Sequence, residues 1–523
     1  MYKRFFKFTL VIALAAGGCV QFGGVSQAPG PGKPADAGKS ESKQLFFRVT
    51  DYGASGNGKT KDTQAIQKAI DAANQAGGGT VWFPPGTYLS GTVRLKSNVT
   101  LYLEAGAILL GTKDIENYPR IVSNFRSYTD NYTYQSLIYG ENVQNVAIIG
   151  RGAIDGQGAK FKRKHPKRRY GERPYMIRFV SSQKIRLEGI TLRNSPMWVQ
   201  HYLACDNLVV DGITVHSQVN ANNDGINIDC CQDVRIANCS ITSGDDAIVL
   251  KSTADRVCKN VAVTNCVLST HCNGLKLGTE SNGGFKNITI SNCALHDVNL
   301  AGIALEMVDG GTLDRVTVSN ITMNKVGGAI FLRLGNRARP FRENMAKPAM
   351  GTFKNVIISN VIATEVGPVG SSITGLPGHP IKNVSLSNIK ITYAGDGSKQ
   401  DAARSVPERP ANYPEYSMFG TLPAYGFYCR HVDGLTFRDI DVRWNKPDHR
   451  PALICDDVQN LQLDLFYGRR MGPEHPMIVL KDVNKVFIIG RWSPTITSSM
   501  ISLQGETKSI SVTTGEPISI PQR

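Results

Sequence analysis

Short apolar runs with every second residue polar recur along most of the chain, and each run ends in a polar turn. This alternation is typical of β-strands. The runs begin at Ile185, Leu208, Val234, Val261, Ile288, Val316, Val356, Val384 and Leu435. Their successive offsets are 23, 26, 27, 27, 28, 40, 28 and 51 residues, and a repeat of this length is typical of a solenoid. We therefore predict an all-β fold, a single-domain parallel β-helix with one coil per repeat.

Two residue types keep fixed places within the repeats. Asparagine occupies one turn position in coil after coil, where it tolerates a left-handed backbone and can hydrogen-bond to the asparagine of the next coil. These residues are Asn238, Asn265, Asn292, Asn320, Asn360 and Asn388. The following position holds Cys239, Cys266 and Cys293, alternating with branched aliphatic residues in other coils. We interpret these cysteines as small buried apolar residues and not as metal ligands.

The N-terminus has the pattern of an export signal. Residues 1–18 combine a basic start with an apolar run, which predicts a secretory signal peptide. The signal ends in a sequence similar to a bacterial lipobox with Cys19 as the lipidated residue, although Ala16 stands where leucine is usual. The alternative cleavage after Ala28 would place Pro29 next to the scissile bond. We therefore favour an exported lipoprotein of the outer membrane, periplasmic or extracellular.

Composition divides the remainder into a tether and one large domain. Residues 19–44 are rich in Gly, Pro, Ser and Ala, which predicts a flexible linker. Residues 45–523 form the predicted β-helix, since each coil of a solenoid buries its apolar face on its neighbours. No apolar run reaches the roughly 18–20 residues of a membrane span. We therefore expect membrane attachment only through the lipid.

The charge balance is basic. The formal net charge is +16, and it falls to +13 when Lys3, Arg4 and Lys7 leave with the signal. Much of the excess lies between Lys160 and Arg173, with eight Lys or Arg and one Glu. Such a run is either a solvated loop or an electrostatic collar for an anionic substrate. Nucleic acid is not expected as a partner, because the basic run is not interleaved with aromatic residues.

Three aspartates form the most informative motif. Asn223-Asp224-Gly225 precedes Gly244-Asp245-Asp246 by 21 residues, which is close to one repeat and therefore places the two motifs on neighbouring coils. Parallel strands lie about 4.8 Å apart, so Asp224 and Asp246 should be near neighbours, with Asp245 displaced sideways. Crowded carboxylates cannot all ionise easily, and the resulting mixture of acid and carboxylate is what glycoside cleavage needs. The alternative is that these acids cap turns or bind calcium between coils.

Four segments together resemble a known family. They are residues 51–88, residues 95–111, Asn223–Gly225 and "SGDDAIVLKS" from Ser243. In combination they are similar to glycoside hydrolase family 28, the polygalacturonase family, and to its bacterial secreted members. The resemblance implies a right-handed parallel β-helix with a short N-terminal capping helix. It also implies inverting hydrolysis of an α-linked, anionic pectic polysaccharide or oligosaccharide.

The resemblance also implies roles for the acids. Asp245 would protonate the leaving oxygen, while Asp224 and Asp246 would position and deprotonate the attacking water. An inverting hydrolase separates its acid and base by roughly 6.5–9.5 Å so that water fits between them. This chemistry needs neither a cofactor nor a metal, and we expect none. Asn223 would lie beside these acids in the substrate-binding site.

The chain departs from the family pattern at two places in the expected substrate-binding site. Asn273 stands where members carry histidine before the glycine, and His271 lies two residues earlier, on the same face of a strand. His271 either reaches the acids or is a turn histidine. Members also show Arg-Ile-Lys where this chain has Ala304-Leu305-Glu306. A uronate next to Glu306 would be repelled unless another cation compensates, which favours a neutral neighbour, as in rhamnogalacturonan.

Compensating cations are available nearby. Lys251 and Lys276 lie at or near the outward-facing positions that stack with the aspartates from coil to coil. The next coil offers Arg333, Arg337 and Arg339. We expect Lys276, Arg333 and Arg337 to bind substrate, and the alternative is that the arginines are solvated turn residues.

Insertions between coils bear on the mode of attack. The segment from Asp396 to Phe427 is rich in tyrosine and proline, and inserted loops on a solenoid often build its binding face. A loop that closes the groove would favour attack at the ends of rhamnogalacturonan or galacturonan-derived chains, whereas a rigid packed loop would bind nothing. A calcium-dependent polysaccharide lyase and a non-catalytic glycan-binding β-helix remain as alternatives to a hydrolase.

Overall fold

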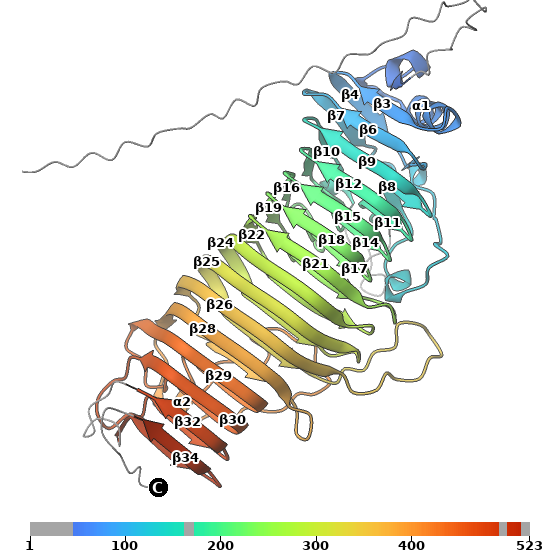
Figure 1. Cartoon of the computed structure of the whole chain (residues 1–523). Coiled ribbons are helices and arrows are strands. Elements are labelled where there is room, and N and C mark those ends of the chain that lie inside the picture. The colour runs from blue at the N-terminus through green and yellow to red at the C-terminus, as the bar shows by residue number, and fades with distance from the viewer. Residues whose placement is uncertain (1–44, 162–171, 491–498, 514–523) are drawn as a thin grey trace, which may run out of the picture. The chain divides into compact units, whose positions relative to one another are not determined.

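The computed structural model describes residues 45–161, 172–490 and 499–513. The predicted signal peptide, the lipobox and the linker therefore lie outside the described residues, as does most of the basic run. The unit from Gln44 to Arg523 is a right-handed parallel β-helix (Figure 1). The predicted fold is thus confirmed.

The strands form three ladders that run parallel from coil to coil. The first comprises β1 (Phe46–Arg48), β3 (Gly79–Phe83), β6 (Val99–Leu103), β9 (Gln144–Gly150), β12 (Gln183–Glu188), β15 (Asp206–Asp211), β18 (Gln232–Ala237), β21 (Cys258–Thr264), β24 (Phe285–Met307), β25 (Thr312–Leu334), β26 (Thr352–Val366), β28 (Ile381–Gly395), β29 (Phe427–Lys446), β30 (Leu453–Gly468), β32 (Asn484–Ile489) and β34 (Lys508–Thr513).

The second ladder comprises β2 (Asn57–Lys61), β4 (Gly86–Ser90), β7 (Ala107–Gly111), β10 (Ala153–Asp155), β13 (Thr191–Arg193), β16 (Thr214–Ser217), β19 (Ser240–Ser243) and β22 (Val267–Thr270), and continues through the middle of β24. The third comprises β5 (Val93–Arg94), β8 (Ser136–Glu141), β11 (Tyr175–Val180), β14 (Gln200–Leu203), β17 (Ile226–Asp229), β20 (Ile248–Ser252) and β23 (Leu275–Ser281), then the ends of β24 and β25, β27 (Ser371–Thr374), the starts of β29 and β30, β31 (Ile478–Lys481) and β33 (Ile501–Gln504).

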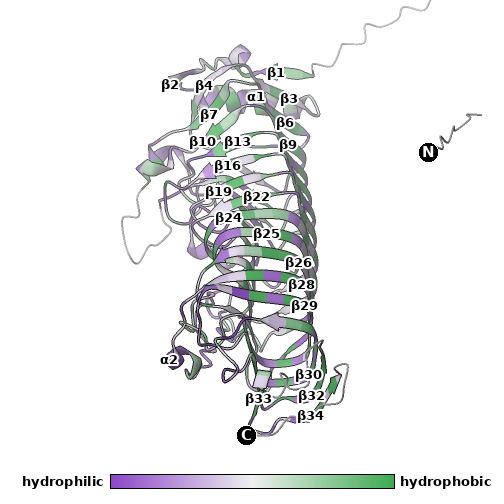
Figure 2. Cartoon of the chain, turned by 90° about the vertical axis from the view of Figure 1, so that its left-hand side faces the viewer, coloured by the Kyte–Doolittle hydropathy of each residue, from purple (hydrophilic) through white to green (hydrophobic). Residues whose placement is uncertain are grey.

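The register of the first ladder matches the repeat predicted from the sequence. Ile185 pairs with Leu208, Leu208 with Val234, and the column continues to Leu435. The side chains of this column are buried, because alternate residues of each strand point into the coil. Hydrophilic and hydrophobic bands accordingly alternate along strands such as β24 to β29 (Figure 2). The buried side chains form one continuous apolar core that extends from coil to coil.

The predicted asparagine column is also present. Asn320, Asn360 and Asn388 each have a left-handed backbone. The amide of Asn360 donates to Asn320 at 2.8 Å, and that of Asn388 donates to Asn360 at 2.8 Å. The cysteines of the next position are buried thiols, as expected.

A helix closes the N-terminal end of the stack. α1 (Thr63–Gln75) buries Ala65, Ile66, Ala69, Ile70 and Ala73, and this spacing forms one apolar helical face. α1 contacts β1, β3, β5 and β6, so it covers the open end of the first coils. The remaining helices are short: α2 (Lys399–Ala402), η1 (Val49–Tyr52), η2 (Ile115–Asn117), η3 (Tyr128–Asn131) and η4 (Gly158–Lys160). Within the described residues, no helix is both long and apolar enough to cross a membrane.

The segment between β28 and β29 packs across the outer face of the third ladder. Its side chains Val406, Met418, Phe419 and Leu422 form a second apolar cluster with Ala304 and Phe331 of that ladder. We call residues 396–426 the inserted segment. Because it covers Ala304 and Phe331, it divides the face on which the predicted catalytic residues lie.

Candidate active site

The three aspartates lie in the turns that lead from the second ladder into the third. Asp224 lies two residues before β17, and Asp246 lies two residues before β20. Ile226 pairs with Ile248, and the Gly225 amide donates to the Asp246 carbonyl at 2.9 Å. Asp224 and Asp246 therefore occupy equivalent positions on neighbouring coils, as the sequence predicts.

Asp246 is the most firmly ionised of the three. It is buried, which by itself raises the pKa of a carboxyl, but the positive charges of Lys276 and Lys251 outweigh burial and hold the pKa of Asp246 below its usual value. The Lys276 ammonium lies 3.3 Å from Asp246 Oδ2. The Asn273 side-chain amide donates to Asp246 Oδ1 at 3.0 Å. This carboxylate is thus suited to accept a proton from water.

Asp245 has the opposite electrostatic setting. Burial and the neighbouring charge of Asp246 raise the pKa of Asp245. Its side chain is only half-buried, and Asn222 donates to its Oδ2 at 3.4 Å. A carboxyl with a raised pKa at the edge of the site can retain a proton and donate it to a leaving oxygen.

Asp224 completes the group. Burial, followed by the charge of Asp245, raises the pKa of Asp224, while Lys251 opposes the shift. The Lys251 ammonium lies 3.9 Å from Asp224 Oδ2. The other oxygen, Oδ1, is buried and has no hydrogen-bond partner among the described residues. Asp224 therefore lies just beneath the surface of the site, next to Lys251.

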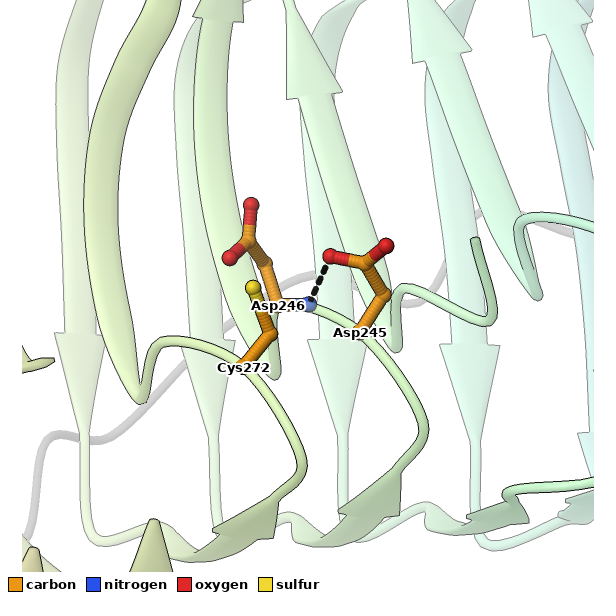
Figure 3. Close-up of side chains that lie close together, drawn as sticks. All are labelled: Asp245, Asp246 and Cys272. Atoms are coloured by element: carbon orange, nitrogen blue, oxygen red, sulfur yellow. Dashed lines mark hydrogen bonds between the residues drawn. The ribbon is translucent and has the colours of Figure 1, made fainter. Parts of the chain in front are cut away.

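Cys272 joins the two adjacent aspartates from the next coil (Figure 3). One ligand atom each of Asp245, Asp246 and Cys272 lies within 4.8 Å of the others, a spacing that would admit a metal ion. Two oxygens and one thiol do not suit calcium, which takes six to eight oxygen ligands. Lys276 also supplies positive charge to Asp246 directly. The donor set therefore does not favour the calcium site that a lyase would need.

A second group of charges borders the aspartates. Glu280 lies 3.6 Å from the Lys251 ammonium, and it accepts from Arg339 at 2.6 Å. These cations hold the pKa of Glu280 far below its usual value despite its burial. Arg337 pairs with the buried Asp309. Among the cations of this group, the side chain of Arg339 is the most exposed, at 27%.

The inserted segment supplies the opposite wall. The ring of Tyr413 lies 5.8 Å from the Lys276 ammonium and 5.8 Å from the Arg337 guanidinium. Burial, and then the negative charge of Asp246, raise the pKa of Glu415, against the effect of Lys276. Tyr416 packs over Gly328, where an added Cβ would meet the tyrosine ring at 2.5 Å. The inserted segment thus closes the site on its C-terminal side.

The sequence profile of glycosyl hydrolases family 28 matches residues 88–411. The chain belongs to this family. It is therefore a glycoside hydrolase, and membership in family 28 favours hydrolysis over the lyase alternative.

Similar proteins agree with this family. A probable polygalacturonase from Vitis vinifera is 29% identical over 373 residues, which cover 67% of this chain and 75% of the relative. An exopolygalacturonase from Zea mays is 25% identical over 381 residues, which cover 68% of this chain and 85% of the relative. The solved structure of a hyperthermoactive exopolygalacturonase from Thermotoga maritima has a TM-score of 0.59 at 24% identity, and the match covers 67% of this chain and 88% of that one. This last likeness shows the fold.

Glu306 differs from our expectation for its place in the family 28 pattern. Its side chain is 0% exposed, so in this structure it lies beneath the surface of the site and does not face it. Glu306 instead accepts from the Thr279 hydroxyl at 3.0 Å and lies 3.9 Å from the Lys276 ammonium. Burial raises the pKa of Glu306 to about 8. It is a buried neighbour of Lys276.

Arg333 and Asn223 are also placed differently from our expectation. Arg333 is buried, and it donates to the carbonyls of Gly375 at 3.1 Å and of Glu408 at 2.7 Å. The amide of Asn223 donates to the carbonyls of Ser195 at 2.8 Å and Met197 at 3.0 Å. Since their polar groups bind backbone, both residues shape the site and do not face it. Arg333 anchors the inserted segment.

The other expected substrate-binding residues border the site. Asn273 lies beside Asp246, and Lys276 and Arg337 lie under Tyr413. His271 is exposed, with its Nε2 3.2 Å from the side-chain nitrogen of Gln218. The role of His271 in substrate binding stays a prediction.

The sequence did not single out several residues that the family 28 fold brings to the site. The ring of Trp198 lies 5.0 Å from the Lys251 ammonium, and it packs on His201, whose Nε2 lies 3.1 Å from Asp229. Burial lowers the pKa of His201 to about 4, so this histidine is neutral. No sequence pattern singled out Glu280 either. Each comes from the third ladder or the turn before it. The register could have found Trp198, because His201 pairs with Asn227 and Trp198 therefore stands one coil before Asp224.

Proposed function

We propose that this chain hydrolyses α-glycosidic bonds of galacturonate-containing pectic chains, with inversion, and that it acts from the chain end. The observation that carries the proposal is the meeting of Asp224, Asp245 and Asp246 in two neighbouring turns, with pKa values shifted in opposite directions. Pairs of acids whose environments separate their pKa values are typical of acid and base partners. The family and the names of the relatives point to the same substrate class.

We assign the roles from these settings. Asp245 is the general acid, because its raised pKa and partial exposure let it carry a proton to the leaving oxygen. Asp246 is the general base, since Lys276 keeps it ionised. Asp224 positions the attacking water together with Asp246, a role that rests on the family resemblance.

The spacing of the acids bears on stereochemistry. An oxygen of Asp245 and an oxygen of Asp246 lie within 4.8 Å, which is closer than the roughly 6.5–9.5 Å between the carboxyl groups of an inverting pair. This single spacing does not favour inversion, and our assignment of inversion rests on the family resemblance. The anomer released first, read by NMR before it equilibrates, decides the point.

Attack at chain ends is supported by the inserted segment. Tyr413 and Tyr416 stand on the C-terminal side of the aspartates, and the apolar cluster beneath them fixes their segment to β24 and β25. A sugar chain bound along the third ladder would therefore meet a wall after the scissile bond. A blocked groove admits chain ends in preference to internal bonds.

Cations of the site can balance the negative charge of a uronate substrate. With Glu306 buried, the repulsion that argued against a uronate is absent from the site surface. Lys251 lies 3.9 Å from Asp224, and Glu280 links it to Arg337 and Arg339, whose side chains are 12% and 27% exposed. We therefore favour galacturonan-derived oligosaccharides over rhamnogalacturonan.

We also propose that the protein is exported and held by a lipid at Cys19. This rests on the basic and apolar pattern of residues 1–18 and the lipobox-like sequence that follows. Labelling with a radioactive fatty acid, lost in a Cys19→Ala variant, tests it.

A product screen tests the enzymatic proposal. Polygalacturonan, rhamnogalacturonan and short oligogalacturonates are incubated with the wild type and with Asp245→Asn, and released chain lengths are followed. Release of monomers or dimers from polygalacturonan from the first time point supports the proposal. Early release of long fragments, or cleavage of rhamnogalacturonan alone, contradicts it.

A further inference from the structure

A second pocket lies on the far side of the inserted segment. It has a volume of about 710 Å³, within the roughly 300–1,000 Å³ typical of ligand sites. The third ladder forms the floor of this pocket through Tyr428, Ile454 and Val479. One wall is α2 with the residues that follow it, and the other is formed by the turns that contain His449 and His475. We call it the C-terminal pocket.

The C-terminal pocket and the active site share one face of the β-helix. Lys276 pairs with Ala304, Ala304 with Phe331, Phe331 with Ser372, and Ser372 with Tyr428. Four steps at about 4.8 Å place the two sites roughly 19 Å apart along the ladder. Met418, Phe419 and Leu422 of the inserted segment cover the strands between them. The pocket is therefore separate from the active site and not an end of its groove.

The lining of the C-terminal pocket is strongly cationic. Its basic side chains are Lys399, Arg404, Arg430 and Lys481, against the single acid Asp456. Asp456 is already engaged, by Arg430 at 3.5 Å and by Lys481 at 3.4 Å, and Arg430 also pairs with Glu408. Arg404 donates to the Thr421 carbonyl at 3.2 Å, and its charge helps to lower the pKa of the nearby Asp401. Among the described residues, no carboxylate lies within the 4.0 Å of an ion pair from Lys399 or Arg404.

Two histidines add donors on the opposite wall. His449 Nδ1 lies 3.5 Å from His475 Nε2, and their ring centroids are 5.5 Å apart. Glu474 lies 2.8 Å from the other nitrogen of His475. The pocket thus presents positive or donating groups on both walls.

The floor between these walls is apolar. It is formed by Ile454 and Val479, and three prolines, Pro423, Pro451 and Pro476, border it. A small inorganic anion would contact the cations but would leave this surface uncovered. A sugar ring carries C–H groups on its faces and polar groups on its edge, so a carboxylated sugar chain matches both the floor and the walls.

We propose that the C-terminal pocket is a non-catalytic binding site for an oligouronate, a chain of carboxylated sugars. The uronate class follows the proposed substrate of the active site, so this part of the inference rests on that proposal. A long pectic chain held in the pocket raises the local concentration of substrate near the catalytic turns. The pocket should therefore matter for long chains and not for short ones.

Binding to the inactive Asp245→Asn protein tests the site. Titration calorimetry with a saturated pentagalacturonate should show two bound molecules per chain, and adding Lys399→Glu with Arg404→Glu should leave one. Both substituted residues are exposed, so the fold should persist. The exposed Lys390 on β28 lies outside the pocket, and Lys390→Glu is the matched control. One bound molecule before the pocket substitutions, or two after them, would overturn the proposal.

Kinetics and other probes separate this inference from the proposed function. In an otherwise wild-type chain, the two pocket substitutions should raise KM for polygalacturonan at least threefold and leave kcat and the rate on trigalacturonate unchanged. An equal loss on trigalacturonate would contradict a separate site.

Binding of other oligosaccharides tests the uronate assignment. A neutral malto-oligosaccharide should not bind the pocket, and a sulfated oligosaccharide that binds more tightly than the uronate would overturn the assignment. If no pectic polymer is hydrolysed but the pocket binds uronate, the proposed function fails and the binding site stands.

Discussion

The ammonium of Lys276 lies 3.3 Å from Asp246, and both side chains are buried. Lys276 also lies 3.9 Å from the buried Glu306. One lysine thus supplies the nearest positive charge to the proposed base and to the acid behind it. In a buried setting this charge is weakly screened, so it controls which of the clustered carboxyls is ionised.

Lys276→Met should move the acidic limb of the pH profile to higher pH. Activity requires an ionised Asp246 and is lost as pH falls through its pKa. Lys276 lowers that pKa, so removing the lysine raises it, and the loss begins at higher pH. The profile of kcat/KM against pH measures the effect, with the exposed Lys390→Met as the control. An unmoved limb with a lower plateau would assign Lys276 to substrate binding alone.

Asp245→Asn and Asp246→Asn should each lower kcat/KM by about 10² or more on a natural substrate, as expected for general acid and base groups. They should differ on an aryl glycoside with a good leaving group. That substrate needs little protonation, so Asp245→Asn should recover much of its rate, while Asp246→Asn should not. Equal losses of the two variants on both substrates would count against the assigned roles, and thermal melting checks that both variants remain folded.

Shortening the inserted segment should change the products. Replacing residues 411–417 with a shorter Gly-Ser linker removes Tyr413 and Tyr416, the wall beyond the aspartates. Fragments of intermediate length should then appear early, and the viscosity of polygalacturonan should fall faster for each bond cleaved. Tyr413→Ala is a milder test, and the exposed Tyr467→Ala on β30 is its control. Products that stay monomeric or dimeric would show that the segment does not limit the groove.

EDTA should leave the activity intact and the products saturated. The carboxyls supply both acid and base, and Lys276 provides the positive charge beside Asp246 that a metal would otherwise provide. The assay follows reducing ends with and without chelator. Loss in EDTA that calcium restores, with absorbance appearing at about 235 nm from unsaturated uronates, would contradict the hydrolytic assignment and indicate β-elimination chemistry.

The sequence predicted the coils well because their cause is local. Apolar residues alternate along the strands, and asparagines stand in left-handed turns from Asn238 to Asn388. The register then follows from counting, and the pairing of Ile226 with Ile248 and of Ile248 with Leu275 was predictable to the residue. The meeting of Asp224 and Asp246 is a direct consequence of this register.

The sequence could not predict which polar side chains face the groove. Glu306 and Arg333 pair across β24 and β25, and their positions suggested substrate contacts. The inserted segment, which lies about 100 residues later, buries that part of the face and binds Arg333 through its carbonyls. Burial of this kind depends on long-range packing, and no pattern near Glu306 reveals it. Adding cations at Ala304 and Glu306 should accordingly disrupt folding and not create a substrate contact.

Glu306→Gln tests the buried position of Glu306 through the pH dependence of stability. Burial raises the pKa of Glu306 from 4.5 to about 8 in the folded chain. Between these values the unfolded chain releases the proton while the folded chain keeps it, so folding loses stability as pH rises, and the loss levels off above about 8. Glutamine cannot titrate, and its carbonyl can still accept from Thr279. The melting temperature of Glu306→Gln should therefore exceed that of the wild type by a margin that grows from pH 4.5 to pH 8.

The matched control is Glu343→Gln, at an exposed position, and its melting temperature should show no such trend. A margin for Glu306→Gln that stays constant with pH would mean that the carboxyl is ionised in the folded protein through its pairing with Lys276.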